Sequence, residues 1–316
     1  MLSARADSWL ASFAARGHAF PADQHTRYVE TAAGRLRVFD SGGVLPPVLF
    51  VPDGPNVIEH YEPLFALLTP HLRLVCFDMP GFGFSLPSAQ YTHALDQGAA
   101  TVIAVLDALK IERATLAFSC GNGFYALRTA KLAPQRIASL FLSQTPSLAA
   151  MRRWTDRIVP GLLRVPVLGQ LTFWLTRKRA AHGWYDTALP RSTDREPFRA
   201  PARRALSCGA CFSLAGVVQG LLRAREADID GVTAPCTQVW GARDHSHKHT
   251  LAASLLDCVP HAELVQFDDC GHFPDLEHPA RYAPLLIAHV AAHAGAPASG
   301  RSGVPTADGP QQRRAA

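Results

Sequence analysis

Short apolar runs alternate with helix-like segments along most of the chain, and this alternation limits its possible folds more than any other feature. Six runs have the length and composition of buried strands, at residues 48–51, 72–77, 114–118, 137–142, 237–240 and 264–267. Segments with helical periodicity lie near residues 58–68, 95–109, 124–133, 251–259 and 279–293. Such alternation predicts an α/β fold with a mostly parallel sheet that is covered by helices on both faces.

Residues 146–230 interrupt this pattern. They are rich in Trp, Leu and Arg at helical spacing and contain no convincing strand, so we predict a helical lid inserted into the sheet domain. The tail after residue 294 is dominated by small and polar residues with little to bury, which is typical of disorder. We therefore expect four parts: an N-terminal helical segment (1–26), an α/β core (27–145 and 231–294), the lid (146–230) and a disordered tail (295–316).

The net charge of +5 is concentrated in the predicted lid. Residues 146–230 contain 14 Lys or Arg against 7 Asp or Glu, so that the rest of the chain is slightly acidic. A basic segment can attract an anionic substrate, the phosphates of CoA or of a carrier protein, or a lipid surface. A solvated basic face without a binding role is the more common explanation.

Several function classes are disfavoured by what the sequence lacks. The longest apolar run, residues 158–175, is broken by Pro160, Arg164 and Pro166, so we expect no membrane-spanning helix. The first 20 residues lack the apolar core of a secretory signal, and seven irregularly spaced cysteines do not form a disulfide pattern, which favours a cytoplasmic location. The chain has no phosphate-binding glycine loop, and we expect no cofactor, no metal and no nucleic-acid partner.

A tight turn over residues 119–123 joins the predicted strand 114–118 to the following helix. A turn of this kind raises one side chain above the carboxyl edge of the sheet, with the N–H groups and the positive dipole end of the helix behind it. Both features favour a developing anion, so the raised side chain is a candidate nucleophile. Ser119 and Cys120 both compete for this position.

Three segments resemble motifs of the α/β-hydrolase family, in the order nucleophile, acid and base. They are the turn at residues 119–123, the sequence Gly-Ala-Arg-Asp that ends at Asp244, and the sequence Gly-His-Phe-Pro around His272. The resemblance spans about residues 27–290 apart from the lid, and includes Asp-Met-Pro-Gly-Phe-Gly-Phe-Ser at residues 78–85. It implies that Asp244 fixes the tautomer of His272 and stabilises its imidazolium form, while His272 is the base.

The family pattern also bears on the choice of nucleophile. Read without gaps over residues 113–142, it places Cys120 at the nucleophile and matches the later Gly, Ala, Ala, Pro and Arg, although Phe118 and Asn122 stand where small residues are usual. Placing Ser119 at the nucleophile puts small residues on both sides of it, as the family's turn requires, but displaces every later match by one residue. We favour Cys120 and keep Ser119 as the alternative. A cysteine paired with an imidazole is expected to have a lowered pKa and to be a strong nucleophile.

An oxyanion hole requires two N–H donors, and the resemblance assigns them to Gly121 and to the loop at residues 52–55. We choose Gly54 in that loop because Pro55 has no N–H, and the loop lacks the His that relatives often carry before Asp53. Just after Asp244, the residues His245, His247 and His249 alternate in a way that can bind a metal. We interpret these histidines as a surface loop.

The resemblance implies a hydrolase that cleaves an ester, thioester or lactone of a small molecule through an acyl-cysteine intermediate. Acyl transfer through the same intermediate is an alternative, and a CoA or carrier-protein thioester would then be a natural partner for the basic lid. A ligand-binding protein that has kept the fold but lost turnover is a further alternative, since fold alone does not decide function.

Overall fold

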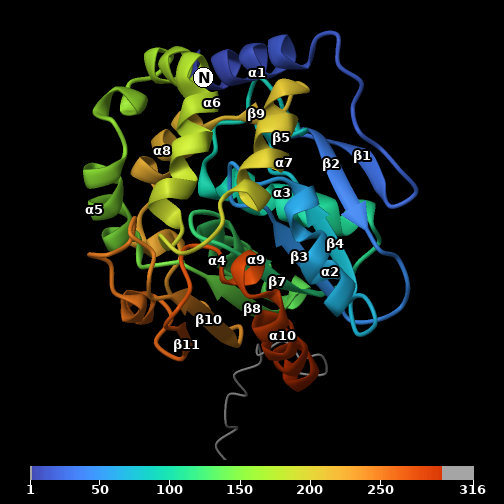
Figure 1. The fold of residues 1–316 in the computed structure, drawn as a ribbon. Coiled ribbons are helices and arrows are strands. Elements are labelled where there is room, and N and C mark those ends of the chain that lie inside the picture. Colours follow the sequence, from blue (N-terminus) through green and yellow to red (C-terminus); the bar gives the residue numbers. More distant parts are fainter. Residues whose placement is uncertain (1, 294–316) are drawn as a thin grey trace, which may run out of the picture.

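The computed structural model describes residues 2–293 (Figure 1). The tail predicted at 295–316 therefore lies outside the described residues. Within them, a central sheet has the strand order β1-β2-β4-β3-β7-β8-β10-β11, and β6 pairs with β2 at its side. Pairing is antiparallel for β1–β2 and β2–β4, and parallel from β4 through β11. The prediction of a mostly parallel, doubly covered sheet is confirmed.

All six strands predicted from apolar runs are present. They are β3 (Pro47–Val51), β4 (Arg73–Phe77), β7 (Ala114–Phe118), β8 (Ile137–Ser143), β10 (Cys236–Gly241) and β11 (Glu263–Phe267). The antiparallel edge consists of β1 (Thr26–Thr31), β2 (Gly34–Asp40) and β6 (Leu86–Pro87). The strands β7 and β8 are buried along their whole length, which explains why they appear in the sequence as continuous apolar runs.

Helices cover the two faces of the sheet as separate sets. The helices α3 (Leu95–Ala108) and α4 (Asn122–Leu132) pack on one face, and α2 (Glu62–Leu68) and α10 (Pro279–His293) pack on the other. Strand β3 shows the division clearly, because Leu49 belongs to the first core cluster and its neighbours Val48 and Phe50 belong to the second. The short helices η1 (Ile58–Tyr61), η2 (Pro134–Arg136), η5 (Ala252–Asp257) and α9 (Pro274–Glu277) lie in the connections.

The segment predicted as a lid forms a helical insertion between β8 and β10. It contains α5 (Leu148–Ile158), η3 (Gly161–Arg164), α6 (Leu168–Ala188), α7 (Glu196–Ser207), α8 (Leu214–Arg223) and η4 (Glu226–Asp228). The expectation that it has no strand is wrong for two residues, since β9 (Cys211–Phe212) pairs with β5 (Phe82–Gly83) of the core. This pairing attaches the insertion to the loop that follows β4. The N-terminal helix α1 (Leu2–Ala15) packs against α6 and α8.

The parallel strands bring distant parts of the chain together at their carboxyl ends. Asp53 follows β3, Cys120 follows β7, Gln144 follows β8, Asp244 follows β10, and His272 follows β11. Because ligand sites of parallel sheets form at this edge, these residues mark the candidate site. Among the described residues, no helix has the length and apolarity required to cross a bilayer.

Candidate active site

The turn between β7 and α4 places Cys120 at its apex. Cys120 has a φ of 51°, a left-handed conformation that is uncommon for a residue with a side chain, and its N–H donates to the Ser143 carbonyl at 2.7 Å. Strained backbone of this kind is often found at functional sites. Ser119 instead forms a bridge to Ser143 in the sheet and is 3% exposed. The thiol, and not the Ser119 hydroxyl, therefore lines the adjoining cavity.

Asp244 and His272 form a close pair, although they belong to different loops. The Nδ1 of His272 lies 2.5 Å from Oδ2 of Asp244, and both side chains are almost fully buried. Burial alone would raise the pKa of Asp244, but His272 outweighs this effect and lowers it to about 2. Burial lowers the pKa of His272, but Asp244 and the other acidic groups nearby raise it well above its usual range. Both shifts favour an imidazolium beside a carboxylate in this pair.

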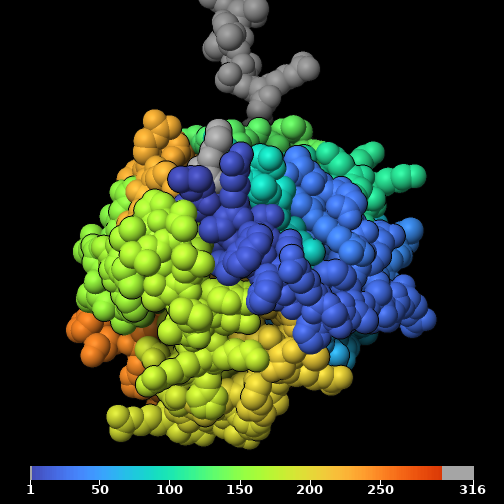
Figure 2. Space-filling view, turned by 90° about the horizontal axis from the view of Figure 1, so that it is seen from above, coloured from blue at the N-terminus to red at the C-terminus, as the bar shows by residue number. Residues whose placement is uncertain are grey.

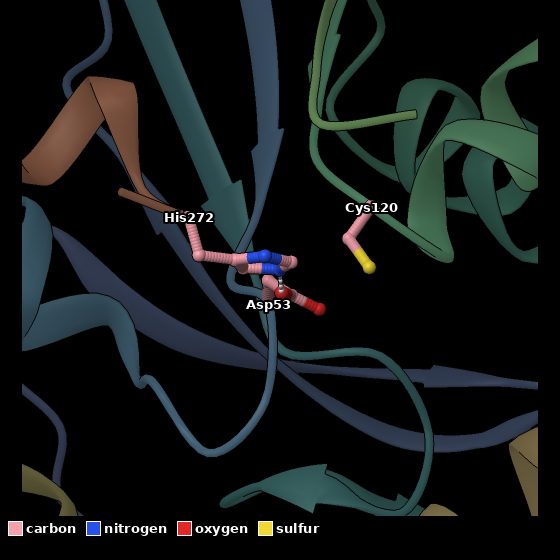
Figure 3. Close-up of side chains that lie close together, drawn as sticks. All are labelled: Asp53, Cys120 and His272. Carbon is pink, nitrogen blue, oxygen red and sulfur yellow. Dashed lines mark hydrogen bonds and ion pairs between the residues drawn. The ribbon is translucent and has the colours of Figure 1, made fainter. Parts of the chain in front are cut away.

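Asp53 hydrogen-bonds to the other nitrogen of the His272 ring, a contact that the sequence analysis did not predict. Its Oδ2 lies 3.0 Å from Nε2 of His272 (Figure 3). With Asp244 at Nδ1, the ring is held between two carboxylates. The sequence offered one signal for this role, a polar side chain directly after the parallel strand β3. In α/β sheets, residues at such positions meet at the ligand site.

The thiol of Cys120 belongs to the same cluster. Its Sγ, a carboxylate oxygen of Asp53 and a ring nitrogen of His272 lie within 4.8 Å of one another. Burial raises the pKa of Cys120 and Asp53 raises it further, against the lowering effects of His272 and of the Gly121 N–H. Burial also raises the pKa of Asp53. The direction of the shift at Cys120 is opposite to the lowered thiol pKa that the sequence analysis expected.

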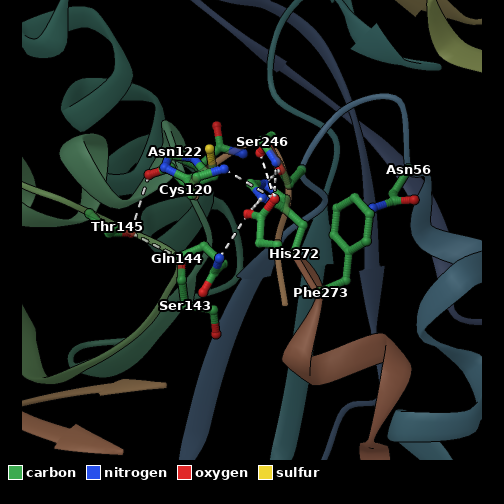
Figure 4. Close-up of polar contacts among 12 residues, drawn as sticks. Asn56, Cys120, Asn122, Ser143, Gln144, Thr145, Ser246, His272 and Phe273 are labelled. Carbon is green, nitrogen blue, oxygen red and sulfur yellow. Dashed lines mark hydrogen bonds and ion pairs between the residues drawn. The ribbon is translucent and has the colours of Figure 1, made fainter. Parts of the chain in front are cut away.

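Gln144 holds Asp244 in place. Its Nε2 donates to Oδ2 of Asp244 at 2.8 Å, and its Oε1 accepts from the Gly241 N–H at 2.7 Å (Figure 4). Ser246 donates to the other carboxylate oxygen of Asp244 through its N–H and its hydroxyl, at 2.8 and 2.7 Å. Sequence reasoning missed Gln144 and Ser246, although each follows the end of a parallel strand by only a few residues.

The two expected oxyanion donors, Gly54 and Gly121, both line the cavity beside Cys120. Gly121 is the N-cap of α4, at the positive end of the helix dipole, and its N–H lowers the pKa of the Cys120 thiol. The N–H groups of the first turn itself donate to the carbonyls of Ser119, Cys120 and Gly121. A Cβ atom at Gly54 would lie 2.7 Å from the ring of Phe82, so only glycine fits without a shift of that ring. The side chain of Asn122 donates to the Pro52 carbonyl at 3.3 Å and connects the two loops.

A cavity of about 260 Å³ opens onto these residues, between the sheet edge and the helical insertion. Its apolar lining includes Met151, Trp154, Leu163, Phe173, Trp184 and Leu221. Trp184 also contacts the ring of His272 edge-on, with centroids 5.2 Å apart. Among the described residues that line the cavity, Asp53 is the one with a charged side chain.

Comparison with known proteins identifies the family. The sequence pattern of the Alpha/beta hydrolase family matches residues 48–285, most of the chain. The chain belongs to this family. It is an enzyme of the hydrolase class.

The chain is similar to several named hydrolases. The 2-hydroxymuconate semialdehyde hydrolase of Pseudomonas sp. (strain CF600) is 27% identical over 82% of this chain and 92% of that protein. The pimeloyl-[acyl-carrier protein] methyl ester esterase of Xanthomonas campestris pv. campestris (strain B100) is 26% identical over 73% of this chain and 90% of that protein. The crystal structure of the enol-lactonase from Burkholderia xenovorans LB400 superimposes with a TM-score of 0.62, at 17% identity over 84% of this chain and all of that one. This last likeness concerns the fold alone.

In this α/β-hydrolase, His247 is part of the site, so its interpretation as a surface residue is wrong. His245 and His249 are exposed, but His247 is 2% exposed and its ring stacks on Trp154 and on His272, with centroids 5.2 and 5.4 Å away. Burial lowers the pKa of His247 to about 3, so the ring is neutral at physiological pH. It acts as an aromatic support for His272.

Among the residues that the structure describes, two groups of side chains are close enough to bind a metal ion, and both include His272. They are Asp53 with Cys120 and His272, and Asp244 with His247 and His272. Within each group a nitrogen of His272 is already hydrogen-bonded to an aspartate. The close spacing of both groups is therefore explained by the hydrogen bonds that orient the imidazole.

Proposed function

We propose that this α/β-hydrolase cleaves a neutral ester, thioester or lactone through an acyl-cysteine on Cys120, with His272 as the proton donor to the leaving group and Asp244 as the carboxylate that orients it. The observation that carries this proposal is the position of Cys120 at a strained turn, next to a buried imidazole and at the end of an apolar cavity. Gly54 and Gly121 are the proposed donors to the oxyanion. The helical insertion is the proposed lid over the substrate.

The two carboxylates around His272 suggest how protons move in this site. As Sγ of Cys120 attacks the carbonyl carbon, Asp53 takes the thiol proton, because His272 is already protonated. The imidazolium then gives its proton to the leaving alkoxide or thiolate as the bond to it breaks. Asp53 passes the thiol proton to His272, which restores the imidazolium beside the acyl-cysteine.

Hydrolysis of the acyl-cysteine repeats these transfers with water. Water attacks the thioester carbon and loses a proton to Asp53. The C–S bond breaks, and the released thiolate takes a proton from His272, after which Asp53 returns the proton from water to the imidazole. Asp244 remains ionised throughout, in keeping with its pKa of about 2.

The lining of the cavity supports an uncharged acyl group. It offers aromatic and aliphatic contacts and a single acidic residue, Asp53, beside the reacting carbon. An acyl group with its own carboxylate would meet repulsion there and would find no cation to pair with among the described lining residues. A medium-chain or aromatic acyl group fits these contacts.

The basic residues of the insertion do not favour a CoA or carrier-protein substrate. No Lys or Arg of the described residues lines the cavity. Several arginines pair instead with acids of the same segment, as in Arg164 with Asp156, Arg199 with Asp186 and Arg203 with Glu196. Exposed pairs of this kind are typical of a solvated surface.

A substrate panel tests the proposal. We expect p-nitrophenyl esters of medium-chain or aromatic acids to be cleaved with a higher kcat/KM than the acetate, because the longer acyl groups fill the apolar cavity. A monoester of a dicarboxylic acid with the same chain length should be a poor substrate, because its free carboxylate would face Asp53. For the esters that are cleaved, rapid-quench mass spectrometry should detect the acyl adduct on the enzyme. Addition of amine or thiol acceptors distinguishes hydrolysis from acyl transfer. Absence of turnover and of any adduct across esters, thioesters and lactones would favour a ligand-binding protein.

The role of Asp53 leads to a separate expectation for thiol reactivity. Replacing Asp53 with Asn removes a negative charge beside Cys120, which lowers the thiol pKa and shifts the pH profile of iodoacetamide alkylation toward lower pH. At pH 7 the alkylation rate of Cys120 should rise by about tenfold for each unit of pKa decrease. Peptide mapping after timed alkylation measures this rate.

The exposed Cys208 provides an internal control for this experiment, since it lies outside the site and its rate should not change. The same variant should lose ester hydrolysis even as its thiol becomes more reactive, because the proposed proton acceptor is missing. A slower alkylation of Cys120 in Asp53→Asn would show that the Asp53 carboxylate does not raise the thiol pKa.

A further inference from the structure

The helix α1 presents an apolar face to solvent. Leu2, Trp9 and Phe13 are 69%, 57% and 47% exposed, and their spacing places them on one side of the helix. The opposite side contains the buried Ala4, Leu10 and Ala11, which pack toward the rest of the protein. The exposed face is therefore not needed to attach α1 to the fold.

A second set of exposed apolar side chains lies on η3 and α6. It consists of Leu162, Val165, Leu168, Leu171 and Leu175, which are 42% to 82% exposed. The three leucines of α6 follow one another at intervals of three and four residues, so they share one side of this helix. Leu175, at the end of this row, is its most exposed member at 82%.

Aromatic contacts join the two sets into one surface. Trp9 stacks on Phe13 with centroids 5.7 Å apart, and Phe13 contacts Trp174 of α6 at 6.1 Å. The view from above shows α1, in dark blue, lying directly beside the yellow-green residues of the insertion (Figure 2). We call this surface, made of the exposed apolar residues of α1, η3 and α6, the apolar face. Patches of contiguous exposed apolar residues mark interaction sites.

The charges around the apolar face are mostly positive, and the exposed acid Asp156, next to it in sequence, is paired with Arg164. Residues 2–16 and 157–179 contain seven Lys or Arg and a single acid, Asp7, which is buried. Arg5 and Arg16 flank the apolar residues of α1, while Lys178 and Arg179 follow those of α6, and all four are exposed. Arg16 also lies over the ring of Phe13, at 5.6 Å from its centroid. Aromatic and leucine side chains with a basic border match an anionic lipid surface.

We propose that the apolar face docks this enzyme onto anionic membranes. The leucine and aromatic side chains enter the interface of the bilayer, and the basic residues pair with lipid phosphates. A second copy of the chain is a poorer occupant, because two such faces would bring like charges together. In this proposal the enzyme lies on the surface of the bilayer.

The position of the cavity suggests what docking achieves. Three exposed residues line the cavity and are close in sequence to the apolar face: Ile158 at the end of α5, Pro160 just before η3, and Thr176 on α6. An apolar ester dissolved in the bilayer can therefore reach the cavity without crossing water. This entry route rests on the proposed function, whereas docking itself does not.

Vesicle binding tests the proposal without any substrate. The full chain should co-sediment with vesicles of phosphatidylcholine and phosphatidylglycerol, bind weakly to phosphatidylcholine alone, and release as salt rises. The triple substitution Trp9→Ser, Phe13→Ser and Leu175→Ser should weaken binding by about tenfold or more, and Arg5→Glu with Arg16→Glu should weaken binding to anionic vesicles only. Leu251→Ser, at an exposed leucine outside the apolar face, is the matched control and should bind like the unmodified protein.

Two measurements keep the outcomes distinct. Hydrolysis of a soluble p-nitrophenyl ester should be unchanged in the triple variant, because none of its three positions lines the cavity. A triple variant that loses ester hydrolysis but binds vesicles normally would count against the proposed function and against the role of the apolar face in docking. Equal binding of the triple variant and the Leu251→Ser control to anionic vesicles would overturn the proposal. So would a dimer in sedimentation velocity that the triple variant converts to monomer, since a second copy would then cover the apolar face.

Discussion

Replacement of Cys120 by alanine is expected to reduce kcat by about 10⁴-fold or more on every substrate that the enzyme cleaves. In the proposed mechanism, Sγ of Cys120 forms the covalent bond to the acyl group, and no other nucleophile lies at the apex of the turn. Ser119 is the nearest alternative in sequence, but it pairs with Ser143 in the sheet and is buried away from the cavity. Ser119→Ala should therefore change kcat by less than tenfold.

Mass spectrometry provides the decisive measurement for this pair of variants. The unmodified enzyme, quenched during turnover, should gain the mass of one acyl group, and digestion should place it on the peptide with Cys120. Since Ser119 and Cys120 share that peptide, fragmentation or hydroxylamine sensitivity is needed to distinguish a thioester from an ester. Full activity in Cys120→Ala, with inactive Ser119→Ala, would assign the nucleophile to Ser119 and would require the turn to rearrange.

The local sequence was sufficient to predict the strands and the residues that end them. A buried parallel strand requires a continuous apolar run, and the polar residue that follows it stands at the sheet edge regardless of the rest of the fold. The turn after such a strand drew attention to Cys120, whereas Asp244 and His272 were named from the resemblance of their motifs to those of the α/β-hydrolase family. The helix–strand alternation similarly predicted the two covered faces of the sheet.

Contacts between loops could not be predicted in this way. The pair of Asp53 and His272 joins residues 219 positions apart, and it depends on the path of two loops that carry no common pattern. Local hydrogen bonds also overrode the pattern at His247. The N–H groups of Ser246 and His247 both donate to Oδ1 of Asp244, which turns the loop inward and buries a ring that the alternating histidines suggested was exposed.

The second large effect is expected for Asp244→Asn, with a reduction of kcat by about 10³- to 10⁴-fold. An amide at this position offers its N–H₂ group as well as its oxygen to Nδ1 of His272, and it no longer raises the pKa of the imidazole. His272 would then deprotonate at a lower pH. The limb of the pH–rate profile that reports the titration of His272 should therefore shift to lower pH. Steady-state kinetics from pH 5 to 9 measures both changes.

The same substitution should also affect stability, in a direction that follows from the pKa of Asp244. This pKa is about 2 in the folded protein against 3.8 for a free side chain, so the carboxylate stabilises the fold above pH 4 and this contribution is lost as the pH falls toward 2. At neutral pH we expect Asp244→Asn to lower the free energy of unfolding by about 2 kcal/mol, measured by urea denaturation. At pH 3 the difference between the two proteins should be smaller.

Asp53→Asn is the matched control for the identity of the acid, because Asp53 and Asp244 contact opposite nitrogens of the same ring. If Asp244 orients His272, its amide variant loses kcat and stability together, and the thiol does not become more reactive toward iodoacetamide. If Asp53→Asn reproduces the stability loss and the acid shift of the pH profile, while Asp244→Asn changes kcat by less than tenfold, then Asp53 is the acid of the triad. The proton route through Asp53 would in that case be wrong, since an orienting carboxylate must stay ionised through the reaction.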